Sequence, residues 1–406
     1  MDYISTKEAA KKWLVSIRCV QGFLTEGRIP GATKLGRSWA IPSDAKKPAD
    51  LRNREDTERS AGEYPHVPHL YCYLPLPRGN ADLAGQSLKN ETERTMLRAE
   101  LAKLRGDFAT AERLCRQIPA GSPIKVCASA LLAECAIDTG NYPQYVKANG
   151  YLMGAHGGCE ESAAQTALLS IRMSMLISGE EHKLTSESFA QLPVEVRPLI
   201  VYLHLKNLQS ELEFSRMVDV SEAALALILR KDTYTVLEVY IFLLCAVGHF
   251  GLKETEEARR YISRAMDIAL PDGIIMPFVE FLADCGGFIE QCVEEKFPEY
   301  SKLILDKWNE VWENWISFRN SYINGAQMAI LPLRECQIAM FIANGATYDE
   351  TASHFGLSLG RIRNLTSSIY GKLNVSSRSE LRELMLHGQS SKLKNLTLSV
   401  ISAFEY

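Results

Sequence analysis

A three-residue turn motif recurs in the middle of the chain, 34 residues apart. Gly106-Asp107-Phe108 is followed by Gly140-Asn141-Tyr142, and small and apolar residues precede both turns in matching positions. Glycine favours the end of one helix and Asp or Asn the start of the next. A fixed period of this length is typical of stacked helical hairpins. We therefore predict a mainly α-helical chain whose middle is a solenoid of such hairpins.

The 406 residues are too many for one ordinary core, so several domains are expected. Two helical patterns followed by two strand-like runs open the chain, and a stretch rich in Arg, Pro and Gly comes next. Helical patterns then continue almost to the end. The predicted organisation is a first domain at 1–50, a linker at 51–90, helical repeats at 91–325, a helical domain at 326–390 and a tail at 391–406.

The most informative local pattern begins at Leu331. Thr347 and Glu350 have the spacing of a capping box, and Ser358 is placed to start a further helix. Four apolar residues at helical spacing predict a narrow inward face on that helix: Ile362, Leu365, Ile369 and Leu373. The opposite face carries small, polar and basic side chains, which can approach a DNA groove closely. These outward residues are Gly360, Arg361, Arg363, Asn364, Ser367 and Ser368.

This segment closely resembles the DNA-binding domain of LuxR-type transcription regulators. The matching pattern includes Leu331-x-x-Arg334-Glu335, Thr347-x-x-Glu350-x-Ala352 and Lys372-Leu373. The resemblance implies a four-helix helix-turn-helix domain in which the third helix enters the major groove and the fourth forms a dimer contact. Thr351, where an aliphatic residue is usual, and Leu365, often histidine, depart from the pattern. The implied DNA-binding residues are Thr347, Arg361, Arg363, Asn364, Ser367, Lys372 and Arg378.

The N-terminal segment is strongly basic, with eleven Lys and Arg against five acids in residues 1–54. Such a balance favours counterion release on DNA. Ser5 and Glu8 predict a capping box, Ser16 is placed to cap a second helix, and Gly36-Arg37 predicts a hairpin turn.

The run from Ser16 to Gln21 resembles the excisionase and MerR-type winged-helix group. The resemblance implies a DNA-binding site of Ser16, Arg18, Gln21 and Arg37. Arg18 and Gln21 would enter the major groove, and Arg37 would reach phosphate or the minor groove. The alternative is that this wing binds protein or folds back on the repeats.

The 34-residue period resembles tetratricopeptide repeats, which form a concave binding surface. A third such unit is expected from Gly251 to Gly273, and the whole middle resembles the sensor region of large LuxR-type regulators. Those regulators usually carry an ATPase domain, but the chain contains no Gly-x-x-x-x-Gly-Lys-Ser/Thr loop. A nucleotide-driven switch is therefore disfavoured.

Other candidate sites are weaker. His66, His69 and Cys72 are residue types that ligate zinc, but incidental clustering is favoured. An aromatic stripe is expected to pack the last repeat or a partner protomer, with a ligand cleft as the alternative. No catalytic constellation is recognisable, so no enzymatic activity, cofactor or metal is expected. The aromatic residues are Trp308, Trp312, Trp315 and Phe318.

The chain shows no signal-peptide pattern, and its most apolar stretch, Val236 to Leu252, is expected to be a buried helix. Its ten scattered cysteines favour reduced thiols in a cytoplasmic protein. The combined prediction is a bacterial-type, one-component regulator of transcription that binds double-stranded DNA at both ends. Its helical repeats would sense a small molecule or protein, and a homodimer and contact with RNA polymerase stay open. The alternative is a protein-binding repeat scaffold whose end domains do not bind DNA.

Overall fold

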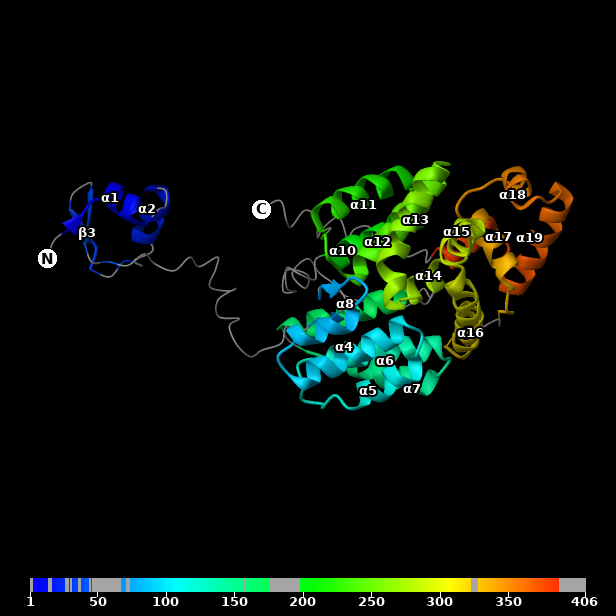
Figure 1. Ribbon diagram of the computed structural model, residues 1–406, viewed down its shortest axis with the longest axis horizontal. Coiled ribbons are helices and arrows are strands. Elements are labelled where there is room, and N and C mark those ends of the chain that lie inside the picture. The colour runs from blue at the N-terminus through cyan, green and yellow to red at the C-terminus, as the bar shows by residue number, and fades with distance from the viewer. Residues whose placement is uncertain are drawn as a thin grey trace. The chain divides into compact units, whose positions relative to one another are not determined.

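The protein is mainly helical and divides into two compact units, residues 1–63 and 64–406 (Figure 1). The fold comes from a computed structural model. The residues that it describes are 3–13, 17–25, 29, 31–35, 38–43, 45, 67–70, 74–156, 158–174, 198–228, 230–322 and 328–386.

The first unit combines two helices with a small antiparallel sheet in the order β1-β3-β2. Ser5 and Glu8 form the predicted capping box, with the Ser5 amide donating to Glu8 Oε2 at 2.8 Å. Ala9, Trp13 and Ile41 belong to the buried core between the helices and the sheet. The elements are β1 (Tyr3–Ile4), α1 (Thr6–Trp13), α2 (Ile17–Thr25), β2 (Thr33–Leu35) and β3 (Ser38–Pro42).

The second unit begins within the interval predicted as a linker. Leu70, Leu74 and Leu76 are buried in its core. The short strand β4 (Leu76–Pro77) pairs antiparallel with β5 (Thr233–Tyr234), which lies more than 150 residues later in the chain. Residues 67–70 and 74–90 of the predicted linker therefore pack in this unit, because their leucines find apolar partners among the helices. Residues 51–66 lie outside the described part.

The repeat motif forms two helical hairpins. The first is α4 (Glu91–Leu104) with α5 (Phe108–Arg116), and the second is α6 (Lys125–Asp138) with α7 (Tyr142–Met153). Gly106 and Gly140 adopt positive φ angles of +81° and +68°, which glycine tolerates without strain. Asp107 and Asn141 then cap the next helix, accepting hydrogen bonds from Thr110 N at 3.0 Å and Gln144 N at 3.2 Å. The predicted turn chemistry is confirmed at both positions.

The same turn recurs twice without glycine. Leu212 and Lys253 have φ angles of +59° and +68° and precede α11 and α13, respectively. Gly251, predicted to open the third repeat, instead ends α12. A Cβ atom there would lie 2.5 Å from the Phe214 ring, so close packing of α12 against α11 explains this glycine better than the turn does.

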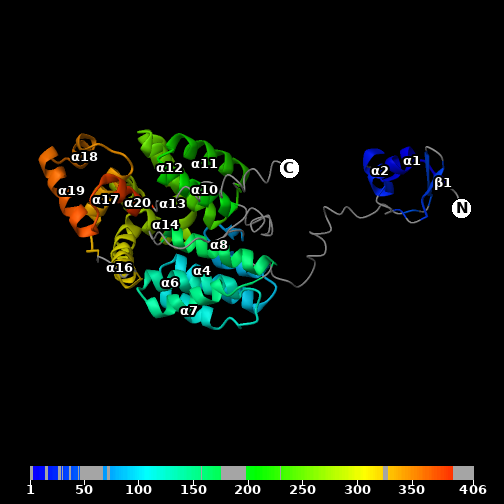
Figure 2. The same cartoon turned by 180° about the vertical axis from the view of Figure 1, so that it is seen from behind.

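The helices of the second unit pack mainly against their chain neighbours (Figures 1 and 2). α12 is buried along almost its whole length, as predicted for the apolar stretch. The first half of the unit contains η2 (Ala81–Ser87), α4 (Glu91–Leu104), α5 (Phe108–Arg116), α6 (Lys125–Asp138), α7 (Tyr142–Met153), α8 (Gly158–Ser174) and α10 (Pro198–Ser210). The second half contains α11 (Phe214–Ile228), α12 (Val236–Gly251), α13 (Thr255–Ala269), η4 (Leu270–Asp272), α14 (Met276–Phe281), η5 (Asp284–Gly287), α15 (Phe288–Lys296) and α16 (Pro298–Tyr322).

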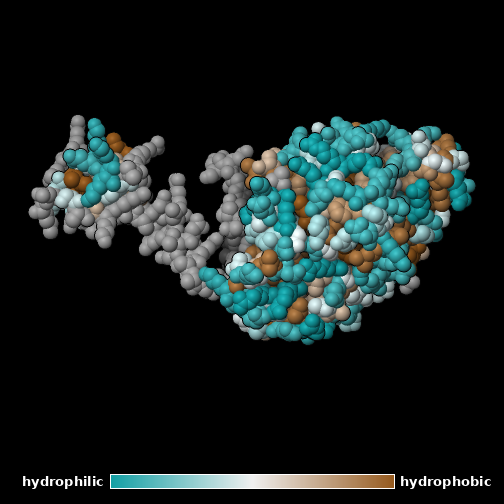
Figure 3. All heavy atoms as spheres, viewed as in Figure 1, coloured by the Kyte–Doolittle hydropathy of each residue, from teal (hydrophilic) through white to brown (hydrophobic). Residues whose placement is uncertain are grey.

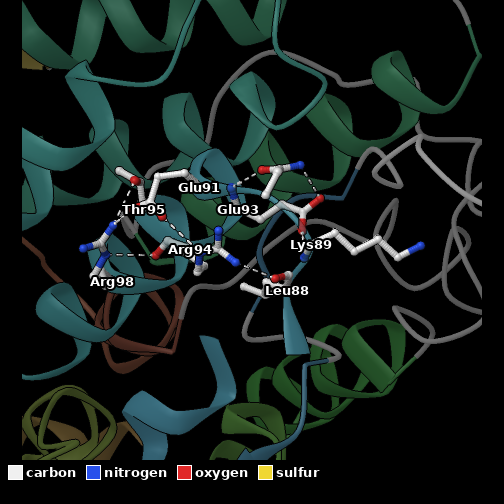
Figure 4. Close-up of polar contacts among 8 residues, drawn as sticks. Leu88, Lys89, Glu91, Glu93, Arg94, Thr95 and Arg98 are labelled. Carbon is white, nitrogen blue, oxygen red and sulfur yellow. Dashed lines mark hydrogen bonds and ion pairs between the residues drawn. The ribbon is translucent and has the colours of Figure 1, made fainter. Parts of the chain in front are cut away.

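The first helix of this series has a well-defined start (Figure 4). Asn90 Oδ1 accepts a hydrogen bond from Glu93 N at 2.8 Å, and Glu93 Oε2 accepts one from Lys89 N at 3.0 Å. The Arg94 guanidinium donates to the Leu88 carbonyl at 2.9 Å. These bonds satisfy amides that the helix itself leaves unpaired.

The last four helices belong to the same compact unit as the hairpins. α17 packs against both η5 and α20. A Cβ on Gly286 would lie 2.7 Å from the His354 ring, so η5 approaches these helices very closely. Their bounds are α17 (Leu333–Ala343), α18 (Tyr348–Phe355), α19 (Leu359–Leu373) and α20 (Arg378–Met385).

Hydrophilic residues cover most of the visible surface of the second unit (Figure 3). Among the described residues, no helix combines the length and the apolar character that a bilayer crossing needs. The seven cysteines described as free thiols are all buried, as predicted for core positions: Cys115, Cys127, Cys135, Cys245, Cys285, Cys292 and Cys336.

Candidate functional site

Helix α19 is held in place by caps at both of its ends. Gly356 turns the chain at a φ of +64° after α18, and Ser358 Oγ then accepts a hydrogen bond from Arg361 N at 3.3 Å. Asn374 ends the helix in the left-handed conformation. Thr347 and Glu350 form the predicted capping box at the start of α18. The helix thus has a defined direction and length.

The inner face of α19 differs slightly from the prediction. Ile362, Ile369 and Leu373 are buried, but Leu365 is only half-buried. Thr366, a polar residue, takes the fourth buried position, and its hydroxyl donates to the Ile362 carbonyl at 2.8 Å. Thr351 on α18 is buried in the same way, with its hydroxyl donating to the Thr347 carbonyl at 2.6 Å. Both threonines are tolerated because the helix backbone satisfies their hydroxyl groups.

The outer face of α19 is open to solvent. Arg361, Arg363, Asn364 and Ser367 are all exposed, and no ion pair of Arg361 or Arg363 occurs within the described part of the chain. A Cβ on Gly360 or Gly371 would meet no atom within 4 Å. In both ribbon views α19 lies at the outer edge of the second unit (Figures 1 and 2). The face therefore combines cationic groups, an amide and small residues on an accessible helix.

Three further residues predicted to bind DNA make side-chain contacts within the chain. Lys372 is half-buried, and its ammonium group bonds both oxygens of Glu335 at 2.8 and 2.6 Å. The Arg378 guanidinium lies over the Tyr348 ring, 5.3 Å from its centroid. Thr347 is exposed, but its hydroxyl already participates in the capping box. Lys372 thus has a structural partner within the domain, unlike Arg361 and Arg363.

The N-terminal candidates are only partly described. Ser16 and Arg37 lie outside the described residues, and Arg18 lies on α2 with its side chain undescribed. Gln21 lies on the same helix and is exposed.

Contacts join the last four helices to the hairpins. Lys253, in the turn between α12 and α13, donates to Glu350 Oε1 at 2.6 Å. Gln337 donates to Glu290 Oε2 at 2.7 Å, and the His354 ring lies 3.1 Å from the Gly286 carbonyl oxygen. The bond from Lys253, together with the Thr347 amide and hydroxyl, lowers the pKa of Glu350 to about 2. The N-terminal turn of α18 is therefore attached to the turn between α12 and α13.

A cavity of about 220 Å³ lies inside the second unit. Its wall includes residues of α4, α6, α10, α12, α14 and α16, and residues of α17 and α20 complete it. Trp308, Trp312 and Trp315 form a stacked aromatic wall, with successive ring centroids 5.7 and 5.2 Å apart. The predicted aromatic stripe thus packs within the chain and also lines a ligand-sized space.

Charged side chains from distant segments meet in this cavity. Glu134 lies between His69 Nε2 at 3.1 Å and Lys103 Nζ at 3.5 Å, and Lys103 also lies 3.5 Å from Glu280. Lys206 is buried and donates to Gln209 Oε1 at 3.0 Å. Burial raises the pKa of Asp138 to about 7. The cavity therefore offers buried ammonium groups, carboxyl groups and aromatic rings to a small molecule.

His69 makes the stability of this cluster depend on pH. Burial alone would lower its pKa, but the negative charges of Glu134, 3.1 Å from Nε2, and of Glu100 outweigh burial and raise the pKa from 6.5 to about 9. Because the pKa is higher in the folded state, protonation of His69 stabilises that state. This stabilisation is complete below pH 6.5 and is lost as the pH rises through 9. We expect the free energy of unfolding to fall by about 2 kcal/mol between pH 7.5 and 9.5. Urea unfolding across this range measures it, and the variant His69→Gln should show a flatter profile; equal slopes would contradict the assignment.

Two further predictions concern the weak zinc candidate at residues 66–72 and the dimer contact of α20. His66 and Cys72 lie outside the described residues, while His69 lies close to two carboxylates, Glu100 and Glu134. On α20, the predicted dimer helix, Leu381, Leu384 and Met385 are buried in a helix that packs on α17. This apolar face is therefore covered within the chain.

The chain matches no known protein family, no curated protein and no solved structure.

Proposed function

We propose that the chain is a sequence-specific DNA-binding regulator of transcription, of the one-component type. In this proposal α17 to α20 form a LuxR-type helix-turn-helix domain, with α19 as the recognition helix. The hairpins from α4 to α13 form a tetratricopeptide-like sensor.

The observation that carries the proposal is the outer face of α19. A recognition helix needs side chains that reach base edges, a backbone that can approach the groove and a buried opposite face. Arg363, Asn364 and Ser367 are exposed on one side, Gly360 leaves open space, and Ile362 anchors the other side. Arg361 and Arg363 carry charges that no neighbouring carboxylate within the described chain neutralises, so both are available to phosphates or bases.

The N-terminal unit is proposed to be a second DNA-binding module, a winged helix with α2 as its recognition helix. Support comes from the antiparallel β2–β3 pair, which would form the wing, and from the exposed Gln21 on α2. Two modules on one chain gain affinity for paired sites when their separation matches.

The cavity is the proposed effector site. At about 220 Å³ it is smaller than pockets for drug-sized ligands, so it suits a small polar metabolite. Its wall includes Cys336 and Met340 of α17, which also supports α19. Ligand occupancy and the position of the recognition helix would therefore be coupled.

Selection of bound duplexes from a random-sequence pool with the full chain tests the DNA-binding proposal. We expect enrichment of one shared sequence and an affinity that falls steeply with salt, because phosphate contacts release counterions. Binding without any enriched sequence would leave only a nonspecific basic surface. No binding at low salt would favour the alternative, a repeat scaffold that binds protein.

A further inference from the structure

Three residue types that ligate transition metals converge between α11 and α12, and none of them belongs to α19 or lines the cavity. Cys245 and His249 lie four residues apart on α12, so they share one helix face. Glu222 reaches them from α11, which packs against α12. The ligand atoms of the three side chains all lie within 4.8 Å of one another. None of these residues belongs to the surfaces discussed above.

The histidine has the hydrogen bond that a metal ligand needs. His249 Nδ1 lies 2.7 Å from Glu254 Oε2, and since a carboxylate only accepts, Nδ1 carries the proton. With Nδ1 facing Glu254, the Nε2 atom points away from that carboxylate and is the ring atom open to a metal ion. Metal-bound histidines commonly have this arrangement, with a carboxylate holding the second ring nitrogen. Stacking on Tyr261, 5.2 Å between centroids, fixes the ring further.

The second ring nitrogen is buried and has no hydrogen-bond partner. His249 is only 6% exposed, and its Nε2 atom forms no hydrogen bond with the described residues. Glu222 Oε1 lies 3.6 Å from it, beyond hydrogen-bonding distance. Leaving a buried polar atom unpaired destabilises the folded state. A metal ion bound at Nε2 would remove that destabilisation.

The distance between His249 Nε2 and Glu222 Oε1 suits a tetrahedral ion. Metal bonds of roughly 2.0–2.3 Å to N, O and S place neighbouring ligand atoms about 3.3–3.7 Å apart. The 3.6 Å between His249 and Glu222 already falls in this range. Cys245 is fully buried, whereas Glu222 is half exposed, so an ion can enter from the solvent side.

We propose that Cys245, His249 and Glu222 bind a divalent transition-metal ion of the zinc type, with water in the fourth position and Glu254 orienting the histidine. One thiolate, one imidazole and one carboxylate favour Zn²⁺ and Co²⁺ over Mg²⁺ and Ca²⁺, which prefer all-oxygen ligands. On binding, Cys245 releases its proton to solvent and the thiolate bonds the ion. This proposal is independent of DNA binding.

Cobalt provides a direct test because a thiolate–Co²⁺ bond has a characteristic charge-transfer absorption. We expect the full chain, stripped with chelator and kept reduced by a phosphine, to bind one equivalent of Co²⁺ with this band. Zn²⁺ should displace it, and excess Mg²⁺ or Ca²⁺ should not. Absence of the thiolate band in the wild-type chain would overturn the proposal.

Variants assign the ligands. Cys245→Ser should abolish the band, whereas Cys292→Ser, at another buried cysteine, should keep it. Glu254→Gln should weaken Co²⁺ binding tenfold to a hundredfold, roughly the loss typical for an outer-shell partner, and Glu256→Gln nearby should not. Glu222→Gln, at a half-exposed position that tolerates substitution, decides the question if Cys245→Ser does not fold. Unchanged Co²⁺ affinity and absorption in both Glu222→Gln and Glu254→Gln would place the ion elsewhere and refute this site.

Discussion

The double variant Arg363→Ala/Asn364→Ala is expected to bind the selected duplex between roughly 30-fold and 25,000-fold more weakly than the wild type. Each base contact by such side chains contributes about 1–3 kcal/mol, and both would be lost. The fold should be unaffected because both side chains are exposed. Fluorescence anisotropy with a labelled duplex at two salt concentrations measures the change. Affinity for random DNA should fall much less.

Three controls separate base contacts from other effects. Arg98→Ala and Arg116→Ala remove exposed arginines of α4 and α5, and neither should change DNA affinity. Lys372→Gln breaks the ion pair with Glu335, so it should lower stability more than DNA affinity. Arg18→Ala/Gln21→Ala measures the contribution of the N-terminal unit. If the α19 double variant binds the selected duplex as tightly as wild type, α19 is not the recognition helix.

Glu134→Gln is expected to destabilise the protein by about 3 kcal/mol. Removing one partner of a buried ion pair leaves an uncompensated charge, which costs roughly 3–5 kcal/mol. Glu134 faces both His69 and Lys103, while Glu280 remains near Lys103 and moderates the loss. Denaturant unfolding gives the change in free energy.

Glu91→Gln is the matched control, since Glu91 pairs with Arg94 and Arg98 on the exposed side of α4. Its loss of stability should be much smaller than that of Glu134→Gln, because surface pairs contribute little. The pair Lys103→Met/Glu134→Met should be less destabilising than Glu134→Met alone, because it leaves no buried ammonium group without its partner. A loss for Glu134→Gln no larger than that for Glu91→Gln would show that the buried cluster does not contribute.

Local chemistry made much of the helical framework predictable. Ser5 with Glu8 and Thr347 with Glu350 form the capping boxes that their spacing indicates, because each box involves only four consecutive residues. Gly106 and Gly140 form matching turns for the same reason. The outward direction of Arg363 followed from helical periodicity, which places it outside the buried stripe of Ile362, Ile369 and Leu373.

Features that depend on distant segments were not predictable. The turns at Leu212 and Lys253 lack the glycine signal, and only tertiary packing holds these residues at positive φ. His69, Lys103 and Glu134 meet through the packing of separate segments, so their spacing in the sequence does not indicate that they are in contact. Cys245 and His249 do show an i, i+4 spacing, but their relation to Glu222 depends on how α11 packs on α12. Thr366 was missed because burial of a hydroxyl cannot be inferred from hydrophobic periodicity alone.

The back wall of the cavity is made partly by Cys336 and Met340, and the helix that carries them also packs on the other helices of the last domain. No hinge or additional element is therefore needed to connect a molecule bound in the cavity with α19. Thermodynamic linkage is reciprocal, so if a metabolite changes the affinity for a duplex by some factor, the duplex changes the affinity for the metabolite by that same factor. Binding to suitable chromosomal sites would then change the affinity of the protein for the metabolite.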